Sequence, residues 1–159
     1  MTSTLPGELP VSDSYETVFQ REYPKVARLA FLLLGRTGEA EEAAQDAFLA
    51  LFERWSSVDN PGAFVHTATV HRCRDIGRRR TVQARILRLL RPRSANSSEP
   101  DYLLDALQQL DVNLRELIVL RYYLQHTVPE IAHIVGVPEG TVKSRLHRAL
   151  KRLGALLNE

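Results

Sequence analysis

Apolar residues recur at intervals of three and four along most of the chain, which is the spacing of one face of an α-helix. Strict alternation of apolar and polar residues, which would indicate a half-buried strand, is absent from the sequence. We therefore expect an all-α protein. The spacing predicts helices over residues 15–34, 39–55, 63–80, 102–110, 114–123, 129–135 and 141–153. Within the first of these, Pro24 is expected to break the backbone hydrogen-bond ladder.

Two of these helices, between Val128 and Leu153, lie on either side of a tight turn. Gly136 ends the first helix, because glycine adopts the left-handed conformation that such a turn requires. We expect the second helix to bury Val142, Leu146, Leu150 and Leu153. Two helices joined in this way predict a helix-turn-helix, whose second helix enters a DNA major groove.

The opposite face of the second helix carries hydrogen-bond donors that suit bases and phosphates. We expect DNA contacts from this helix and its first turn, at Glu139, Thr141, Lys143, Ser144, Arg145, His147, Arg148 and Lys151. The alternative is a solvated amphipathic helix in a bundle. A small residue at Ala132, a turn at Gly136 and an anchor at Val142 favour the helix-turn-helix.

Arginines crowd the predicted third helix and the segment after it. They are Arg72, Arg74, Arg78, Arg79, Arg80, Arg85, Arg88, Arg91 and Arg93. Charge of this density indicates a nucleic acid or, alternatively, a membrane surface. The DNA-reading motif on the same chain favours nucleic acid.

The outer face of the predicted second helix combines acidic residues with a polar and a small one. It is formed by Glu41, Glu42, Gln45, Asp46 and Ala50. This face is either ordinary solvated surface or a docking surface for a basic partner. Its inner stripe is expected to include Phe52 and Trp55.

Turn-forming and polar residues separate two helical parts of the chain. Residues 1–14 are expected to be a flexible lead-in and residues 92–101 a linker, rich in Pro and Ser. We therefore expect two small helical domains, residues 15–91 and 102–159, joined by a flexible linker, with the helix-turn-helix in the second.

The composition is that of a globular protein, with 159 residues, 44% hydrophobic residues and 25% charged residues. A single cysteine, Cys73, excludes an internal disulfide, and the five histidines lack ligand spacing, so we expect no metal site and no cofactor. There is no glycine-rich phosphate loop and no nucleophile beside a base, so we expect no catalytic residues and no small-molecule substrate. The apolar runs are too short to insert in a bilayer and no signal pattern opens the chain, which predicts a cytoplasmic protein.

Both halves of the sequence resemble the extracytoplasmic-function (ECF) sigma factors of bacterial RNA polymerase. The string GTVKSRLHRAL, within LDVNLRELIVLRYYLQHTVPEIAHIVGVPEGTVKSRLHRALKRL, is similar to that family's domain for the −35 promoter element. The strings YPKVARLAFLLLG, EAEEAAQDAFLALFERW and FVHTATVHRCRDIGRRR are similar to its region 2. The resemblance extends from Val18 to Leu157.

This resemblance implies a role for each predicted surface and three partners: core RNA polymerase, promoter DNA and an anti-sigma protein. Residues 15–91 would dock on polymerase and melt the −10 element, and residues 102–159 would bind the −35 element. Docking on the clamp helices is implied for Glu41, Glu42, Gln45, Asp46 and Leu49. Contacts to the −10 element are implied for the loop residues Ser57, Val58, Asp59 and Asn60 and for His71, Arg72, Arg74, Arg78, Arg79 and Arg80.

Two positions depart from the family's pattern, because His71 stands where Asn is frequent and Phe64 where Trp is common. A second function also fits the motif: a stand-alone repressor or activator, with the N-terminal helices sensing a ligand or dimerising. Such a regulator would bind duplex DNA by itself, whereas a sigma factor would need polymerase. The arginine-rich third helix favours the sigma factor, since a sensing domain has no need of it.

Overall fold

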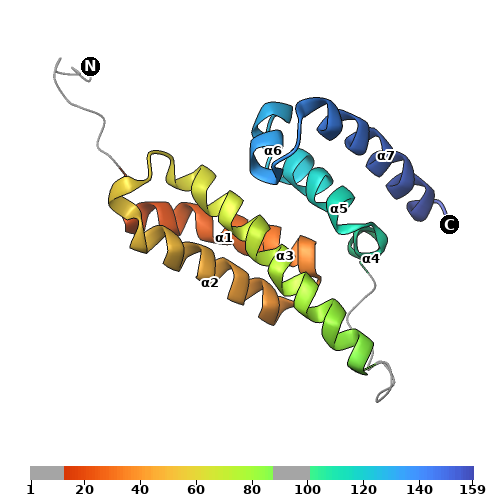
Figure 1. The fold of residues 1–159 in the computed structure, drawn as a ribbon, viewed down its shortest axis with the longest axis horizontal. Coiled ribbons are helices and arrows are strands. Elements are labelled where there is room, and N and C mark those ends of the chain that lie inside the picture. The colour runs from red at the N-terminus through yellow and green to blue at the C-terminus, as the bar shows by residue number, and fades with distance from the viewer. Residues whose placement is uncertain (1–12, 88–100) are drawn as a thin grey trace, which may run out of the picture.

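The computed structural model describes residues 13–87 and 101–159, and the regular elements in these two ranges are all helical (Figure 1). The expected all-α class is therefore confirmed. The expected lead-in and linker lie almost wholly outside the described residues. The helices are α1 (Tyr15–Leu34), α2 (Thr37–Glu53), a 3₁₀ turn (Trp55–Ser57), α3 (Pro61–Leu87), α4 (Tyr102–Gln109), α5 (Val112–Ile118), the π-helix η2 (Val119–Tyr123), α6 (Val128–Val135) and α7 (Glu139–Leu157).

Helix α1 is continuous through Pro24, and the expected break at this proline is wrong. Proline removes one backbone hydrogen bond, but Val18 and Val26 on either side of it are fully buried, and this packing holds the two halves of the helix in line. The helix begins where the Ser14 hydroxyl accepts a bond from the Thr17 amide. It ends at Gly35, which has a φ of 73°.

Helices α1, α2 and α3 lie side by side (Figure 1). Small residues on α2, Ala40, Ala43, Ala44 and Ala47, are buried and allow the helices to approach closely. Phe52, expected in the same stripe, is instead 62% exposed. It follows Leu51, which is fully buried, so a further 100° of helical rotation carries Phe52 to the edge of the contact.

The first half of the structure comprises residues 13–87 and the second half residues 101–159. The second half contains the expected helix-turn-helix, formed by α6 and α7. Gly136 has a φ of 74° and its amide donates to the Ala132 carbonyl, as the turn requires. Helix α7 is longer than predicted at both ends. The expected burial of Leu150 is wrong, because Leu150 is 42% exposed and Ala149 beside it is fully buried.

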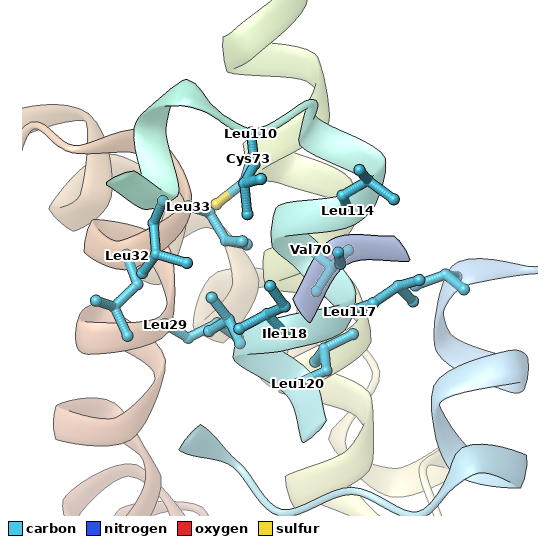
Figure 2. Packing of buried hydrophobic residues seen from close by; sticks show 14 of the residues in the cluster. Leu29, Leu32, Leu33, Val70, Cys73, Leu110, Leu114, Leu117, Ile118 and Leu120 are labelled. Carbon is cyan, nitrogen blue, oxygen red and sulfur yellow. The ribbon is translucent and has the colours of Figure 1, made fainter. Parts of the chain in front are cut away.

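One apolar core joins the two halves (Figure 2). It combines Leu29 and Leu33 of α1, and Val70 of α3, with Leu117 of α5 and Leu120 of η2. Helices α4, α5 and η2 contact α1, and α6 contacts α3. The two helical parts predicted from the sequence are therefore both present and pack directly on one another.

A buried guanidinium also joins the halves. Arg115 of α5 donates to the carbonyls of Leu107, Gln108 and Leu110 and, across the contact, to Leu33, with N···O distances of 2.7–2.8 Å. The last carbonyls of a helix have no partner within that helix. Here the carbonyls at the end of α1 receive donors from Gln108, Arg115 and Arg80. No motif or spacing in the sequence indicated this role for Arg115.

Candidate DNA and polymerase interfaces

Helix α7 presents its expected DNA-facing residues to solvent. Lys143, Ser144, His147, Arg148 and Lys151 are exposed, Glu139 is exposed in the first turn, and Thr141 and Arg145 are half-buried. Within the described ranges, the basic residues among them form no ion pair with an acidic side chain. Their charge is therefore available to a polyanion.

The arginines of α3 face the acidic residues of α2. Arg72 bonds Asp46 at 2.6 Å and Glu42 at 3.3 Å, and Arg79 lies 3.4 Å from Glu42. Arg80 pairs with Glu39 and donates to the Leu34 carbonyl. Two surfaces that the sequence analysis treated separately, the acidic docking face and the basic −10 face, thus lie against each other and partly neutralise each other.

Arg78 differs from its neighbours, because its only partner among the described residues is Asp75 on the same helix, and its side chain is 74% exposed. The side chains of Arg85, Arg88, Arg91 and Arg93 lie outside the part that the structure describes. Arg78 and Arg79 are therefore the most exposed of the described α3 arginines.

Two other expected −10 residues contact the second half of the chain. Arg74 forms a two-pronged bond with the carboxylate of Glu116 in α5, at 2.7 and 2.8 Å, and this bond raises the pKa of Arg74. Glu116 is only 2% exposed. The ring of His71 donates from Nε2 to the Ile134 carbonyl at 3.2 Å, at the end of α6. Both residues are therefore engaged in the contact between the halves.

The loop expected to contact the −10 element connects the 3₁₀ turn to α3. Ser57 donates to the Arg54 carbonyl, and Asn60 accepts a bond from the Ala63 amide, which caps α3. Ser57, Asp59 and Asn60 are exposed, and Val58 is half-buried against the core of the first three helices. The loop is thus held at both ends while most of its side chains face solvent.

An open hollow of about 400 Å³ lies between α1 and α2, beside the acidic face. Its lining is largely aromatic, with Tyr15, Phe19, Tyr23, Phe48 and Phe52 next to Gln45 and Leu49. Leu49 is 56% exposed. Exposed apolar side chains that adjoin one another mark surfaces for protein partners. Leu49 and Gln45 were expected at a docking surface, whereas Phe52 was expected to be buried because of its helical position.

Models of two families match the chain: Sigma-70 region 2 over residues 18–92 and Sigma-70 region 4 over residues 101–153. The ECF RNA polymerase sigma factor SigM of Mycobacterium tuberculosis is 30% identical over 151 residues, which cover 91% of this chain and 77% of SigM. This chain is an ECF sigma factor. The RNA polymerase sigma factor CarQ of Myxococcus xanthus is also 30% identical, over 92% of this chain and 91% of CarQ.

Solved structures show the same fold. The sigma factor RpoE, in complex with the anti-sigma factor NepR from Bartonella quintana, has a TM-score of 0.77 and 24% identity, covering 91% of this chain and 96% of RpoE. CnrH, in complex with the cytosolic domain of CnrY, has a TM-score of 0.68 and 23% identity, covering 91% of this chain and 87% of CnrH.

As a sigma factor, the protein directs promoter-specific transcription by RNA polymerase, as the resemblance implied. The family assignment favours this function over the stand-alone repressor or activator. Among the helices of residues 13–87 and 101–159, none has the length and apolar character needed to cross a bilayer.

Proposed function

We propose that this ECF sigma factor reads the −35 element with α7, engages the −10 element with α3 and the loop before it, and docks on core polymerase through α2. The observation that supports α7 most directly is its exposed row of basic side chains, which form no ion pair with an acidic side chain in residues 13–87 and 101–159. Basic side chains on an exposed helix can bind phosphates of the DNA backbone and donate hydrogen bonds to base edges. In this proposal, residues 15–91 form the domain for polymerase docking and the −10 element, and residues 102–159 form the domain for the −35 element.

A reconstituted transcription assay tests this proposal. Core polymerase with the full chain is expected to start transcripts at a discrete set of promoters that core polymerase alone does not use. Identical start sites with and without the chain would contradict the proposal. The chain alone is expected to bind duplex promoter DNA weakly, whereas strong binding without polymerase would support a repressor.

Replacing Arg145 with Ala is expected to weaken promoter recognition by about 1–3 kcal/mol. This is the free energy by which one side chain bonded to a base edge typically discriminates against the wrong base. The loss should concentrate at one position of the −35 element, as measured by transcription from a library of promoter variants. Arg152→Ala, on the same helix, is the matched control. An equal loss across all promoter sequences would show that Arg145 holds a phosphate instead.

Replacing Arg78 and Arg79 together with Ala is expected to lower the salt dependence of promoter binding by the polymerase complex. Each lost phosphate contact reduces the slope of log K against log salt by roughly 0.7–0.9. Arg36→Ala, a 65% exposed arginine outside α3, provides the control. Arg80 is left unchanged because it pairs with Glu39 and α1. An unchanged slope would place both arginines away from DNA.

We also propose that an anti-sigma protein binds this sigma factor. RpoE was solved with the anti-sigma factor NepR, and CnrH was solved with the cytosolic domain of another protein, CnrY. The protein would act in the cytoplasm, where polymerase and promoter DNA meet, without cofactor or catalytic activity of its own. A protein that copurifies with the chain and suppresses its transcription in the reconstituted assay would establish the partner. Unchanged transcription in its presence would reject that candidate.

A further inference from the structure

Four side chains form a hydrogen-bonded row across the contact between the halves. In the first half, Glu22 of α1 accepts from Nε2 of His66 in α3, at 3.0 Å. Nδ1 of His66 lies 3.0 Å from Nε2 of His126, which precedes α6 in the second half. Nδ1 of His126 lies 2.6 Å from the carboxylate of Glu130 in α6. The sequence spacing of these histidines did not indicate that they meet.

The backbone before His126 is unusual and positions this ring. The π-helix η2 precedes it, and Gln125 has a φ of 59°, which is rare for residues other than glycine. The His126 amide donates to the Leu120 carbonyl, and Arg121 donates to the His126 carbonyl, both at 3.0 Å. Conformations of this kind cost free energy and persist where surrounding contacts hold them, often at functional positions.

The number of protons on the two rings decides whether the row is complete. Three contacts join the four side chains, and each needs one proton between its two atoms. With one proton beyond two neutral rings, His66 donates to Glu22, and His126 donates to both His66 and Glu130. Without it, one contact has no proton; with a second, two N–H groups face each other at 3.0 Å.

We propose that the row Glu22–His66–His126–Glu130 is a proton-dependent latch that holds the second half of the chain against α1 and α3 and releases it in acid. While the latch is closed, His71 and Arg74 of α3 remain bonded to the second half. Release would free both side chains. Only this last consequence, for the −10 element, rests on the proposed function.

The direction of the pH effect follows from His66. Burial, together with the nearby positive charges of His126 and Lys25, lowers the pKa of His66 in the closed form, although Glu22 opposes the shift. Opening removes His126 and admits water while Glu22 remains on α1, so the pKa rises toward or above its ordinary value of about 6.5. The open form therefore binds more protons below that pH, and acid favours opening.

The two carboxylates of the row, Glu22 and Glu130, keep their charge in this pH range. The pKa of Glu22 is raised by burial but lowered more by His66, Arg21 and Lys25, so it lies below its ordinary value. The bond from His126 lowers the pKa of Glu130. Arg21 is itself paired with Asp13 at 2.6 Å, and Arg121 binds the backbone of His126. His66 is therefore the group at this contact whose protonation sets the direction of the pH effect.

Small-angle X-ray scattering of the full chain between pH 7.5 and 5.0 tests the latch. The radius of gyration is expected to rise as the pH falls through about 6, while circular dichroism shows unchanged helix content. One coupled proton changes the open-to-closed ratio by up to about tenfold per pH unit. A constant radius, or a rise that accompanies loss of helix, would overturn the proposal.

Variants separate the latch from general acid effects. His66→Gln should abolish the pH-dependent rise, whereas His133→Gln, an exposed histidine on α6, should retain it. Glu130 is also exposed, so Glu130→Gln should fold normally; it weakens the last bond of the row and should move the transition to higher pH. An unchanged transition in both His66→Gln and Glu130→Gln would overturn the latch.

Promoter melting provides a separate readout for the proposed function. If the chain opens in acid and His71→Ala or Arg74→Ala leaves promoter melting by the polymerase complex unchanged, the latch stands and the −10 role of these residues fails. If those variants impair melting while the scattering shows no opening, the −10 role stands and the latch fails.

Discussion

Replacing Arg115 with Met is expected to lower the free energy of unfolding by about 3–5 kcal/mol, the cost typical of breaking a buried charged network. Arg115 is 9% exposed and satisfies four carbonyls, three at the end of α4 and one in α1. Met fills a similar volume but donates no hydrogen bond, so these carbonyls lose the four bonds from the guanidinium, and among the described residues only that of Leu107 keeps another donor, the Leu110 amide. Urea denaturation followed by circular dichroism measures the change.

Arg152→Met provides the control, because Arg152 is exposed on α7 and has no ion pair among the described residues. Its effect should stay within about 0.5 kcal/mol, as for most surface substitutions. A loss below about 1 kcal/mol at Arg115 would mean that water replaces the guanidinium at the four carbonyls. The contact between the halves would then depend on the apolar core alone.

Replacing Leu49 with Glu is expected to weaken binding to core polymerase at least tenfold without reducing the thermal stability of the chain. Leu49 is 56% exposed, so the free protein tolerates the carboxylate. In the complex, the same carboxylate would be buried against an apolar partner surface, which costs several kcal/mol unless the charge is paired. Competition binding with a fluorescent derivative of the unchanged chain measures the affinity.

Gln20→Glu adds the same charge at an exposed position of α1 and is expected to bind polymerase normally. Equal binding by Leu49→Glu and the unchanged protein would place the docking surface elsewhere. The hollow beside Leu49 also makes the docking proposal more specific. Glu42 and Asp46 already pair with arginines of α3, so apolar contact at Leu49 and Phe52 becomes the larger expected contribution of α2.

Tertiary packing explains why three of the positions expected from the sequence behave differently in the structure. Helical spacing predicted burial for both Phe52 and Leu150, yet both lie one residue beyond the position that meets the neighbouring helix. Periodicity locates an apolar stripe to within about one residue, or 100° of rotation, and the width of the contact decides which edge is covered. Pro24 was expected to break α1, but the packing of Val18 and Val26 outweighs the lost hydrogen bond.

Local features were determined by the sequence alone: the all-α class, the tight turn at Gly136, the helix-turn-helix and the family. Each depends on residues close together in the chain, whose conformational preferences and spacing are visible without tertiary contacts. Only the tertiary structure decided that Arg74 bonds Glu116, that Arg115 bonds Leu33 and that His66 meets His126. These partners are 42, 82 and 60 residues apart, and their pairing follows from how the apolar faces of the two halves pack.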